Sequence, residues 1–379
     1  MIDNLKNAQK NTFNKKTLSH QHSAQYYDMI VFCHLRWQSV YKRPQHIISR
    51  MANTMKILFI EEPLDFNQNE DSGNLIVINE MLHVLQPNVK DIQSIAEIIP
   101  NYVSNETIPF GWFYSAAFCP LLGTMEFENV IYDCMDELSL FKNAPEHLHN
   151  QEKYLISQSN IIFTCGKSLF ESKKQFHKNV YCIPNSVDNY HFAKALNGVA
   201  IPDDIANLKS PIVGFYGVID ECINLELVHE VAKKLPNISF VMIGPLGKIE
   251  ESELPKESNI HYLGMKPYHQ LPNYLKAFDV AMMPFVVNDS TKYISSNKTL
   301  EYMAAGRSII STKIPDVVRD YSICVDLIDT VDEFCESIVF QLERRDRLSM
   351  EMEYYKILQN TSWDATADKM KSIIKTFAR

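Results

Sequence analysis

The chain has 379 residues, of which 46% are hydrophobic and 22% are charged, and its formal net charge is −9. No run of residues approaches the roughly 18 consecutive apolar residues of a membrane-spanning helix, which argues against an integral membrane protein. Single hydrophobic cores rarely grow beyond about 250 to 300 residues, so a chain of this length is expected to form two domains with a cleft between them.

The N-terminal end differs in charge from the rest of the chain. Residues 1–26 are polar, lack the apolar segment of a secretory signal, and are expected to form a mobile tail. Residues 1–60 have a net charge of +7, which leaves −16 for the remainder. A basic end favours weak contact with an anionic membrane surface, and a solvated tail without a partner is the alternative. No nucleic-acid-binding module is visible, and the acidic remainder argues against nucleic acid as a partner.

Strand-like and helix-like segments alternate through the first half of the chain, as expected for a parallel sheet covered by helices. The strands are expected at 28–33, 56–61, 129–133, 160–165 and 180–184, and helices at 43–54 and 166–176.

The second half repeats this alternation, so a second parallel-sheet domain is predicted. The loop-like sequence "NGVAIPDDIANLKSP" places the boundary near residues 190–210. We therefore expect an N-terminal domain at 27–195, a C-terminal domain at 205–360 and a last helix at 361–379. The strands of the second sheet are expected at 211–217, 238–244, 260–264, 279–285, 308–312 and 322–326.

The placement of the glycines indicates which domain holds a nucleotide. No glycine occurs before residue 73, so the turn after the first strand has neither a G-x-G-x-x-G motif nor a P-loop. Gly217, Gly244 and Gly264 each follow a predicted strand of the second half. Ligands of open α/β sheets bind at the carboxyl ends of the strands, so these turns favour a binding crevice there. Taken singly, each is more often an ordinary turn residue.

The eight cysteines include no C-x-x-C pair, and most lie in apolar, strand-like runs. We expect them to be structural, reduced thiols in a cytosolic chain.

The segment "SSNKTLEYMAAG" predicts a short helix that starts near Ser296 or Asn297 and stops at Gly306. Lys298 would lie in the first turn, where its charge opposes the helix dipole. One explanation is an ion pair with Glu301 in solvent. The other is an anion, such as a phosphate, bound where backbone N–H groups and the ammonium converge.

The order and spacing of these segments resemble GT-B glycosyltransferases close to glycosyltransferase family 4. The resemblance is carried by "VGFYGVID", "FVMIGPLGK" and "SSNKTLEYMAAGRSIIST" in the second half, and by "TCGKSLFES…YCIPNSVDNYHF" before it. The segments "FCHLRWQSVYKRPQHIISRMA" and "IYDCMDELSLF" resemble a bacterial subgroup involved in cell-surface polysaccharide synthesis. The resemblance implies two Rossmann-like domains that face a cleft, an acceptor side in the N-terminal domain, and C-terminal helices that cross back to that domain.

In that family the second glutamate of an E-x7-E element holds the donor ribose, which implies this role for Glu301. The start of the same helix would meet the diphosphate of a sugar nucleotide, UDP- or GDP-linked, and no separate cofactor is implied. The resemblance implies phosphate contacts from Lys298 and the backbone near Ser296 and Asn297. The full set of residues expected to bind the donor is Gly217, Gly244, Gly264, Lys266, Tyr293, Ser296, Asn297, Lys298, Thr299 and Glu301.

The chain departs from the family pattern at two places. The first glutamate of E-x7-E, which normally touches the donor sugar, is replaced by Tyr293. The arginine and lysine that usually follow the first glycine turn of the C-terminal domain are also missing, and Asp220 and Glu221 stand there instead. The cations that remain available to neutralise the leaving group are Lys298, Lys248, Lys266 and Arg307.

Glycosyl transfer requires stabilisation of the departing nucleoside diphosphate and, for inversion, a base near the acceptor hydroxyl. Asp136 follows the strand "NVIYD" and is the candidate base, with an N-cap of the next helix as the alternative. His34 follows the first strand and competes as a base or sugar ligand, with a turn histidine bonded to backbone as the alternative. No D-x-D follows an apolar strand, so no metal site is predicted.

Arg36, Trp37 and Arg43 fall on the loop and first helix turn of the N-terminal domain, where acceptors usually bind in this fold. Arginine binds phosphate and tryptophan stacks on sugar rings, so a glycan or phosphate-bearing acceptor is predicted. The alternative is that Trp37 anchors the core.

The segment "GWFYSAAFCPLLG" at 111–123 is expected to be a buried helix, and an apolar wall that faces the acceptor is the alternative.

The leading hypothesis is a metal-independent glycosyltransferase of surface polysaccharide synthesis. It would move a sugar from a nucleoside-diphosphate sugar to a glycan or lipid-linked acceptor, in the cytoplasm or on the inner face of the plasma membrane. The alternatives are a nucleotide-sugar epimerase or hydrolase of the same fold, and a degenerate, non-catalytic partner protein that has kept the fold.

Overall fold

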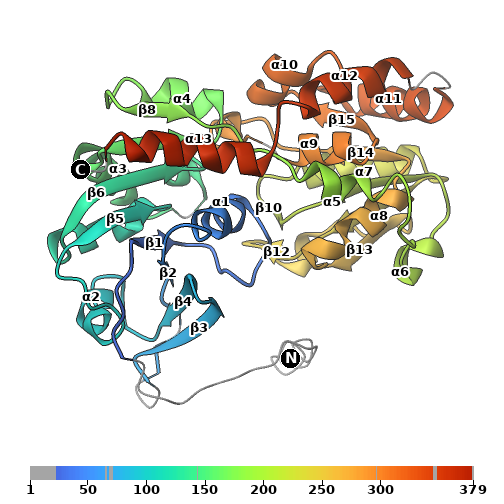
Figure 1. Ribbon diagram of the computed structural model, residues 1–379. Helices are drawn as coiled ribbons and strands as arrows, with labels where there is room; N and C mark the ends of the chain where they lie inside the picture. The colour runs from blue at the N-terminus through green and yellow to red at the C-terminus, as the bar shows by residue number, and fades with distance from the viewer. Residues whose placement is uncertain are drawn as a thin grey trace.

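The computed structural model describes residues 23–64, 66–67, 71–142, 144–295, 297–344 and 348–377. Two α/β halves lie side by side, each built on its own sheet and its own hydrophobic core (Figure 1). The prediction of two parallel-sheet domains is confirmed. Residues 1–22 of the predicted tail lie outside the described residues, and Gln25 forms an isolated bridge with Val103.

The described part of the N-terminal half forms an eight-stranded sheet with the order β3-β4-β2-β1-β5-β6-β7-β8. The central strands β1 and β2 are buried along their whole length, which explains their continuous apolar sequences. The strands are β1 (Met29–Cys33), β2 (Ile57–Glu61), β3 (Gly73–Asn79), β4 (Leu82–Pro87), β5 (Ile108–Phe113), β6 (Phe127–Cys134), β7 (Ile161–Thr164) and β8 (Val180–Cys182).

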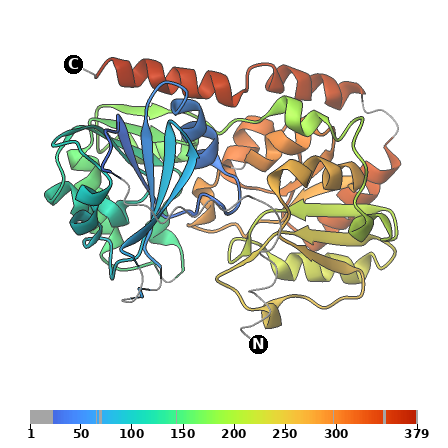
Figure 2. The ribbon, with the colours of Figure 1, turned by 60° about the horizontal axis from the view of Figure 1, so that its bottom comes forward.

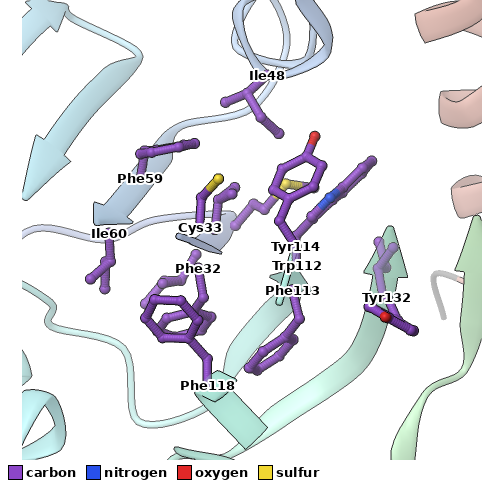
Figure 3. Packing of buried hydrophobic residues seen from close by; sticks show 14 of the residues in the cluster. Phe32, Cys33, Ile48, Phe59, Ile60, Trp112, Phe113, Tyr114, Phe118 and Tyr132 are labelled. Atoms are coloured by element: carbon purple, nitrogen blue, oxygen red, sulfur yellow. The ribbon is translucent and has the colours of Figure 1, made fainter. Parts of the chain in front are cut away.

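Aromatic side chains fill the core of this half. Figure 3 shows Phe32 of β1 close to Phe113 of β5 and to Phe118, and their ring centroids lie 4.8 Å and 5.7 Å from that of Phe32. Such ring pairs add about 0.5 to 1.5 kcal/mol each beyond the burial of their surface. The helices of this half are α1 (Arg43–Met51), α2 (Ile95–Ile98), α3 (Leu148–Gln158) and α4 (Lys167–Lys173).

The C-terminal half contains a six-stranded parallel sheet with the order β13-β11-β9-β14-β15-β16, and a short pair, β10 and β12, beside it. The strands are β9 (Ile212–Tyr216), β10 (Ile219–Asp220), β11 (Ser239–Ile243), β12 (Leu246–Gly247), β13 (Ile260–Gly264), β14 (Val280–Met283), β15 (Ser308–Thr312) and β16 (Asp326–Ile328). The helices are α5 (Asn189–Ala193), α6 (Asp203–Ala206), α7 (Leu225–Lys234), α8 (Leu271–Ala277), α9 (Asn297–Ala304), α10 (Pro315–Tyr321), α11 (Val331–Glu343) and α12 (Leu348–Leu358).

The last helix, α13 (Trp363–Lys375), returns to the N-terminal half, as the resemblance implies. Figures 1 and 2 show it running from the C-terminal half across to the side of the N-terminal sheet. Its Trp363 is buried in the N-terminal core and stacks on His46 of α1, with 4.4 Å between ring centroids. Tyr268 of the C-terminal half meets the same histidine edge to face at 5.5 Å. The two halves are therefore joined by packed rings as well as by the chain.

Three of the predicted elements are wrong in detail. Residues 111–123 do not form one buried helix, because residues 111–113 end strand β5 and a 3-10 helix follows at Ala116–Gly123. Gly111 belongs in the strand for a packing reason, since a Cβ there would lie 2.6 Å from the ring of Phe127 on β6. The N-terminal sheet is not wholly parallel, because β3 pairs antiparallel with β4. The last strand lies at Asp326–Ile328 and not at 322–326.

The eight cysteines are all free thiols, five of them buried and three partly buried. Within the described ranges, no helix is both long enough and apolar enough to cross a membrane.

Candidate functional site

A cleft with a volume of about 380 Å³ lies between the two halves. It is located at the carboxyl ends of the strands, because the turns after β1 and β6 line one wall and the turn after β9 and the start of α9 line the other. The prediction that the strand ends face a crevice is therefore confirmed. The charged and polar side chains that line the cleft are His34, Lys42, Arg43, Asp136, Asn185, Asp220, Glu221, Lys248, Ser295, Asn297 and Lys298.

Lys298 lies in the first turn of α9, with its side chain directed across the turn that follows β9. A Cβ on Gly217 would lie 2.4 Å from Cε of Lys298, so a larger residue there would displace the end of the lysine side chain. Gly217 also has φ 151, a conformation that favours glycine. The ammonium lies 5.8 Å from the centroid of the Phe215 ring, within the range of a cation–π contact.

The charge on Lys298 is not neutralised by a neighbouring carboxylate. Within the described part of the chain it forms no ion pair, and the pKa of Lys298 is lowered, first by loss of water and then by the charge of Lys42. The charges of Glu301, Asp220 and Asp136 act in the opposite direction, with smaller effects than that of Lys42. A cation at a helix N-terminus opposes the helix dipole as well, so the free protein holds positive charge here at a cost in stability.

Glu301 does not form an ion pair with Lys298 in solvent, so this explanation for the lysine in the first turn of α9 is not supported. Its side chain is 3% exposed, and it accepts hydrogen bonds from the hydroxyl of Tyr216 and, at 2.8 Å, from Nδ2 of Asn297. Burial raises the pKa of Glu301. The carboxylate thus lies beneath the cleft, next to Asn297 and not among the described lining residues.

Asp136 follows β6 and faces the cleft. The alternative that it caps the next helix is wrong, because Glu137 holds the N-cap position of the 3-10 helix at Leu138–Leu140. Loss of water raises the pKa of Asp136 to about 6, and the charges of Lys42 and Lys298 limit this rise. A carboxyl group with this pKa is ionised at neutral pH and still basic enough to accept a proton.

Asp133 is in a different environment from Asp136, although it is only three residues away. It is fully buried in β6 and forms an ion pair with Arg43, with 3.0 Å between Nη2 and Oδ1. Arg43 also donates to the backbone oxygen of Ile183 at 2.9 Å. The guanidinium is therefore engaged inside the N-terminal half, and its predicted contact with an acceptor stays a prediction.

His34 lies across the cleft from the C-terminal lysines. Burial lowers the pKa of His34 to about 4, and the charges of Lys42 and Lys248 contribute to this shift. The ring is therefore neutral at neutral pH. Its Nδ1 is buried and has no hydrogen-bond partner among the described residues, so the alternative of a turn histidine bonded to backbone through this atom is not supported.

The loop that joins β1 to α1 is held by one buried carboxylate, that of Glu61. Arg36 forms an ion pair with Glu61 at 2.6 Å, and the backbone N–H of Trp37 donates to the same side chain at 2.8 Å. The indole of Trp37 packs edge to face on Phe59, with 5.0 Å between centroids. Trp37 is thus partly buried against the core, in agreement with the alternative that it anchors the core. Neither Arg36 nor Trp37 is among the described lining residues of the cleft.

The other predicted donor residues are scattered. Lys266 pairs with Asp204 at 2.7 Å, and it does not line the cleft. Thr299 is buried and donates to the sulfur of Met283 at 3.4 Å. Tyr293 packs against the core of the N-terminal half. Ser296 lies outside the described residues. Gly244 directly follows β11 and packs against the backbone of Gly217, and Gly264 is the last residue of β13.

Two lysines that line the cleft, Lys42 and Lys248, were not predicted from the sequence to be site residues. Lys42 was missed, although it precedes Pro44 at the start of α1 and so had to lie at the cleft edge of the N-terminal half. Lys248 was one of four candidate cations. It has φ 60, unusual for a residue with a side chain, and its ammonium lies 5.6 Å from the centroid of the Phe141 ring of the other half.

Arg307 is outside the cleft and donates to the backbone oxygen of Phe278 at 2.8 Å.

Two hydrogen bonds between a side chain and the backbone join the two walls of the cleft. Asn185 of the N-terminal half donates to the backbone oxygen of Ser295 at 2.8 Å, just before α9. The backbone N–H of Lys142 donates to the side chain of Glu221 at 2.9 Å. Within the described residues there is no group of three or more His, Cys, Asp or Glu side chains that could hold a metal ion.

Comparison with known proteins finds similarity to glycosyltransferases in part of the chain and to two-domain α/β structures over almost all of it. Residues 210–344 match the family model described as "Glycosyl transferases group 1". A curated relative, TuaH of Bacillus subtilis (strain 168), is 24% identical over 226 residues and is provisionally described as a teichuronic acid biosynthesis glycosyltransferase. The match covers 55% of this chain and 56% of TuaH, so the chain spans about half the length of that relative.

Solved structures establish the fold over almost the whole chain. A trehalose-6-phosphate protein from E. coli bound with UDP-2-fluoro glucose has a TM-score of 0.69 at 10% identity, covering 92% of this chain and 98% of its own. Sucrose-phosphate synthase from Thermosynechococcus elongatus has a TM-score of 0.66 at 13% identity, with the same coverage. The Anabaena protein HepE in complex with UDP and glucose has a TM-score of 0.64 at 11% identity, covering 92% of this chain and 100% of its own. The chain has the two-domain α/β architecture of these proteins.

Proposed function

We propose that the chain is a glycosyltransferase that moves a sugar from a nucleoside-diphosphate sugar, UDP- or GDP-linked, to a glycan or lipid-linked acceptor in surface polysaccharide synthesis. The observation that carries this proposal is the unpaired Lys298 at the start of α9, which lies against the Gly217 turn in the cleft. The family match of residues 210–344 supports the reaction class, and the likeness to TuaH supports a polysaccharide product.

In the proposed reaction, the bond between the anomeric carbon and the diphosphate oxygen breaks, and its electron pair remains on the nucleoside diphosphate. Lys298 and the first backbone N–H groups of α9 stabilise the charge that develops there. The acceptor oxygen forms the new bond to the anomeric carbon, and its proton passes to Asp136 on the opposite wall. Lysines supply the positive charge in this proposal, so it requires no metal ion.

The proposal is tested by incubating the purified protein with a panel of UDP- and GDP-linked sugars, with and without glycan and lipid-linked acceptors. Release of nucleoside diphosphate only in the presence of an acceptor, and unchanged in excess EDTA, is the expected result. Release without an acceptor would indicate a hydrolase, and an isomerised sugar nucleotide would indicate an epimerase. Binding of nucleotide without turnover under every condition would indicate a non-catalytic protein.

Glu301 is proposed to bind the donor ribose from beneath the cleft. Glu301→Gln is expected to weaken sugar-nucleotide binding about ten- to hundredfold, because a hydrogen bond to a charged group contributes about 1.5 to 3 kcal/mol. Isothermal titration calorimetry measures the change, and the melting temperature reports on the fold. The matched control is Tyr216→Phe, which removes a hydrogen bond that Glu301 accepts but leaves the carboxylate.

Unchanged binding in Glu301→Gln, together with a lower melting temperature, would make this glutamate purely structural. Equal loss of binding in Tyr216→Phe would mean that Glu301 acts by positioning its neighbours.

We also propose that the N-terminal region contacts the anionic cytoplasmic leaflet, with the protein otherwise in the cytoplasm. Arg36, Arg43 and Arg50 each pair with a carboxylate, so they contribute little to such a surface. Lys42 lines the cleft, so apart from Lys56 the proposal depends on Lys6, Lys10, Lys15 and Lys16, which lie outside the described residues.

Each basic residue near an anionic surface contributes about 1 kcal/mol at moderate salt. The full chain is expected to sediment with phosphatidylglycerol vesicles at low salt and to be released at high salt. A variant with glutamine at the four lysines serves as the control. Equal binding of both proteins, or none to anionic vesicles, would contradict this contact.

A further inference from the structure

The cations of the cleft come from both halves of the molecule. Lys42 is the N-cap residue of α1 in the N-terminal half. Lys298 and Lys248 belong to the C-terminal half, in the first turn of α9 and directly after β12. All three line the same cavity. The wall after β9 offers acidic residues instead, Asp220 and Glu221, so the C-terminal half does not provide a compact basic pair at its first glycine turn.

Lys42 and Lys298 lie within electrostatic reach of each other across the cleft. After loss of water, the charge of Lys42 is the strongest influence that lowers the pKa of Lys298. The same lysine also acts on groups of its own wall, since it favours the ionised form of Asp136 and the neutral form of His34. Lys42 and Lys298 line the same cavity, where their two positive charges repel each other in the free protein.

The two lysines differ from Lys173 and Lys266, a buried and a partly buried lysine that pair with carboxylates. Lys173 lies between two glutamates, with 2.7 Å to each, and Lys266 pairs with Asp204 at 2.7 Å. Neither Lys42 nor Lys298 forms an ion pair within the ranges that the structure describes. Two like charges held together without a shared counterion are what an anion-binding site presents when it is free.

The acidic groups of the cleft favour the charged form of Lys298 but form no ion pair with it or with Lys42 among the described residues. Asp220 accepts a hydrogen bond from the backbone N–H of Cys222 at 2.9 Å, and Glu221 accepts one from that of Lys142 at 2.9 Å. Both carboxylates thus hold loops of the cleft. Asp136 remains directed into the cavity as the group proposed to accept the acceptor proton.

We infer that Lys42 and Lys298, one from each half of the molecule, bind the diphosphate of the sugar nucleotide together. This inference rests on the proposed function and adds a residue of the N-terminal half to the donor site. The N-terminal half then contributes both the proposed base, Asp136, and a cation for the leaving group. Since the diphosphate bridges two lysines that otherwise repel each other, nucleotide binding also stabilises the contact between the two halves.

The test is calorimetric titration with UDP and GDP, with uridine and guanosine, and with inorganic pyrophosphate. The variants are Lys42→Gln, Lys42→Arg, Lys298→Gln and the Lys42/Lys298 double glutamine variant. The matched control is Lys233→Gln, which removes a lysine of the C-terminal half that pairs with Glu230 on the surface of α7, at 2.8 Å. Melting temperatures of all variants show whether each is folded.

Lys42→Gln is expected to weaken binding of the preferred nucleoside diphosphate about ten- to hundredfold, while binding of its nucleoside stays unchanged. Lys42→Arg should retain most of the affinity, because the charge remains. The double variant should lose less than the product of the two single losses, because both lysines bind one group. The control should bind as the wild type does.

Wild-type affinity for the nucleoside diphosphate in folded Lys42→Gln would overturn the inference and leave the proposed function intact. A loss that is equal for nucleoside and nucleoside diphosphate would also overturn it, because it would place Lys42 away from the phosphates. If the wild type bound none of these ligands, the proposed function and the inference would both be rejected.

Discussion

Asp136→Asn is expected to lower kcat/KM by about 10² to 10⁴, the usual contribution of a positioned general base. The asparagine keeps the shape of the side chain and cannot accept the proton of the acceptor hydroxyl. Since the base acts in its ionised form and its pKa is raised to about 6, kcat/KM of the wild type should rise with pH, with a midpoint near 6, and level off above it. The variant should lose this rise.

The stability of Asp136→Asn distinguishes a catalytic from a structural role. The folded-state pKa lies above the ordinary value of 3.8, so this carboxyl stabilises the folded protein below about pH 4 and loses that contribution as pH rises through about 6. At pH 7.5 its replacement should therefore not lower the melting temperature. A variant that is folded and retains wild-type activity would exclude Asp136 as the base and favour a reaction that retains the anomeric configuration.

Lys298→Met is expected to lower kcat by about 10² to 10³, as removal of one preorganised electrostatic contact to a developing oxyanion commonly does. The effect should appear in kcat more than in KM, because charge on the diphosphate oxygen increases as the bond to the sugar breaks. The methionine preserves the apolar stem that lies over Gly217 and against Phe215.

The melting temperature of Lys298→Met should be equal to or above that of the wild type at neutral pH. The pKa of Lys298 is lowered, so the folded state disfavours its charged form, and the wild type gains stability only as pH rises towards the ordinary value of 10.5. The difference between variant and wild type should therefore shrink in alkaline buffer. A variant with normal kcat and a clearly lower melting temperature would make the lysine structural.

The local features of the donor side could be predicted from sequence, because neighbours in the chain determine them. The helix start at Asn297, its end before Gly306, and the turns at Gly217 and Gly244 all follow from residue type and order. The placement of Asp136 at the cleft followed from the apolar strand before it. Each of these features depends on a strand or helix end that short-range rules identify.

Features that depend on contacts distant in sequence could not be predicted. From the sequence alone Arg43 is expected to be a free cation. In the structure it pairs with Asp133, which lies 90 residues further along the chain and is buried. The burial of Glu301 depends on Tyr216, 85 residues before it. The edge strand β3 was missed because it is half exposed and antiparallel, so it lacks the apolar run that identified the central strands.

The most direct measurement of the central claim is a crystal structure of the protein with the nucleoside diphosphate that it binds most tightly. The account predicts that a β-phosphate oxygen lies within hydrogen-bond distance of Nζ of Lys298 and of the first backbone N–H groups of α9, with the ribose directed towards Glu301. A diphosphate bound elsewhere in the cleft, with Lys298 still unpaired, would contradict it.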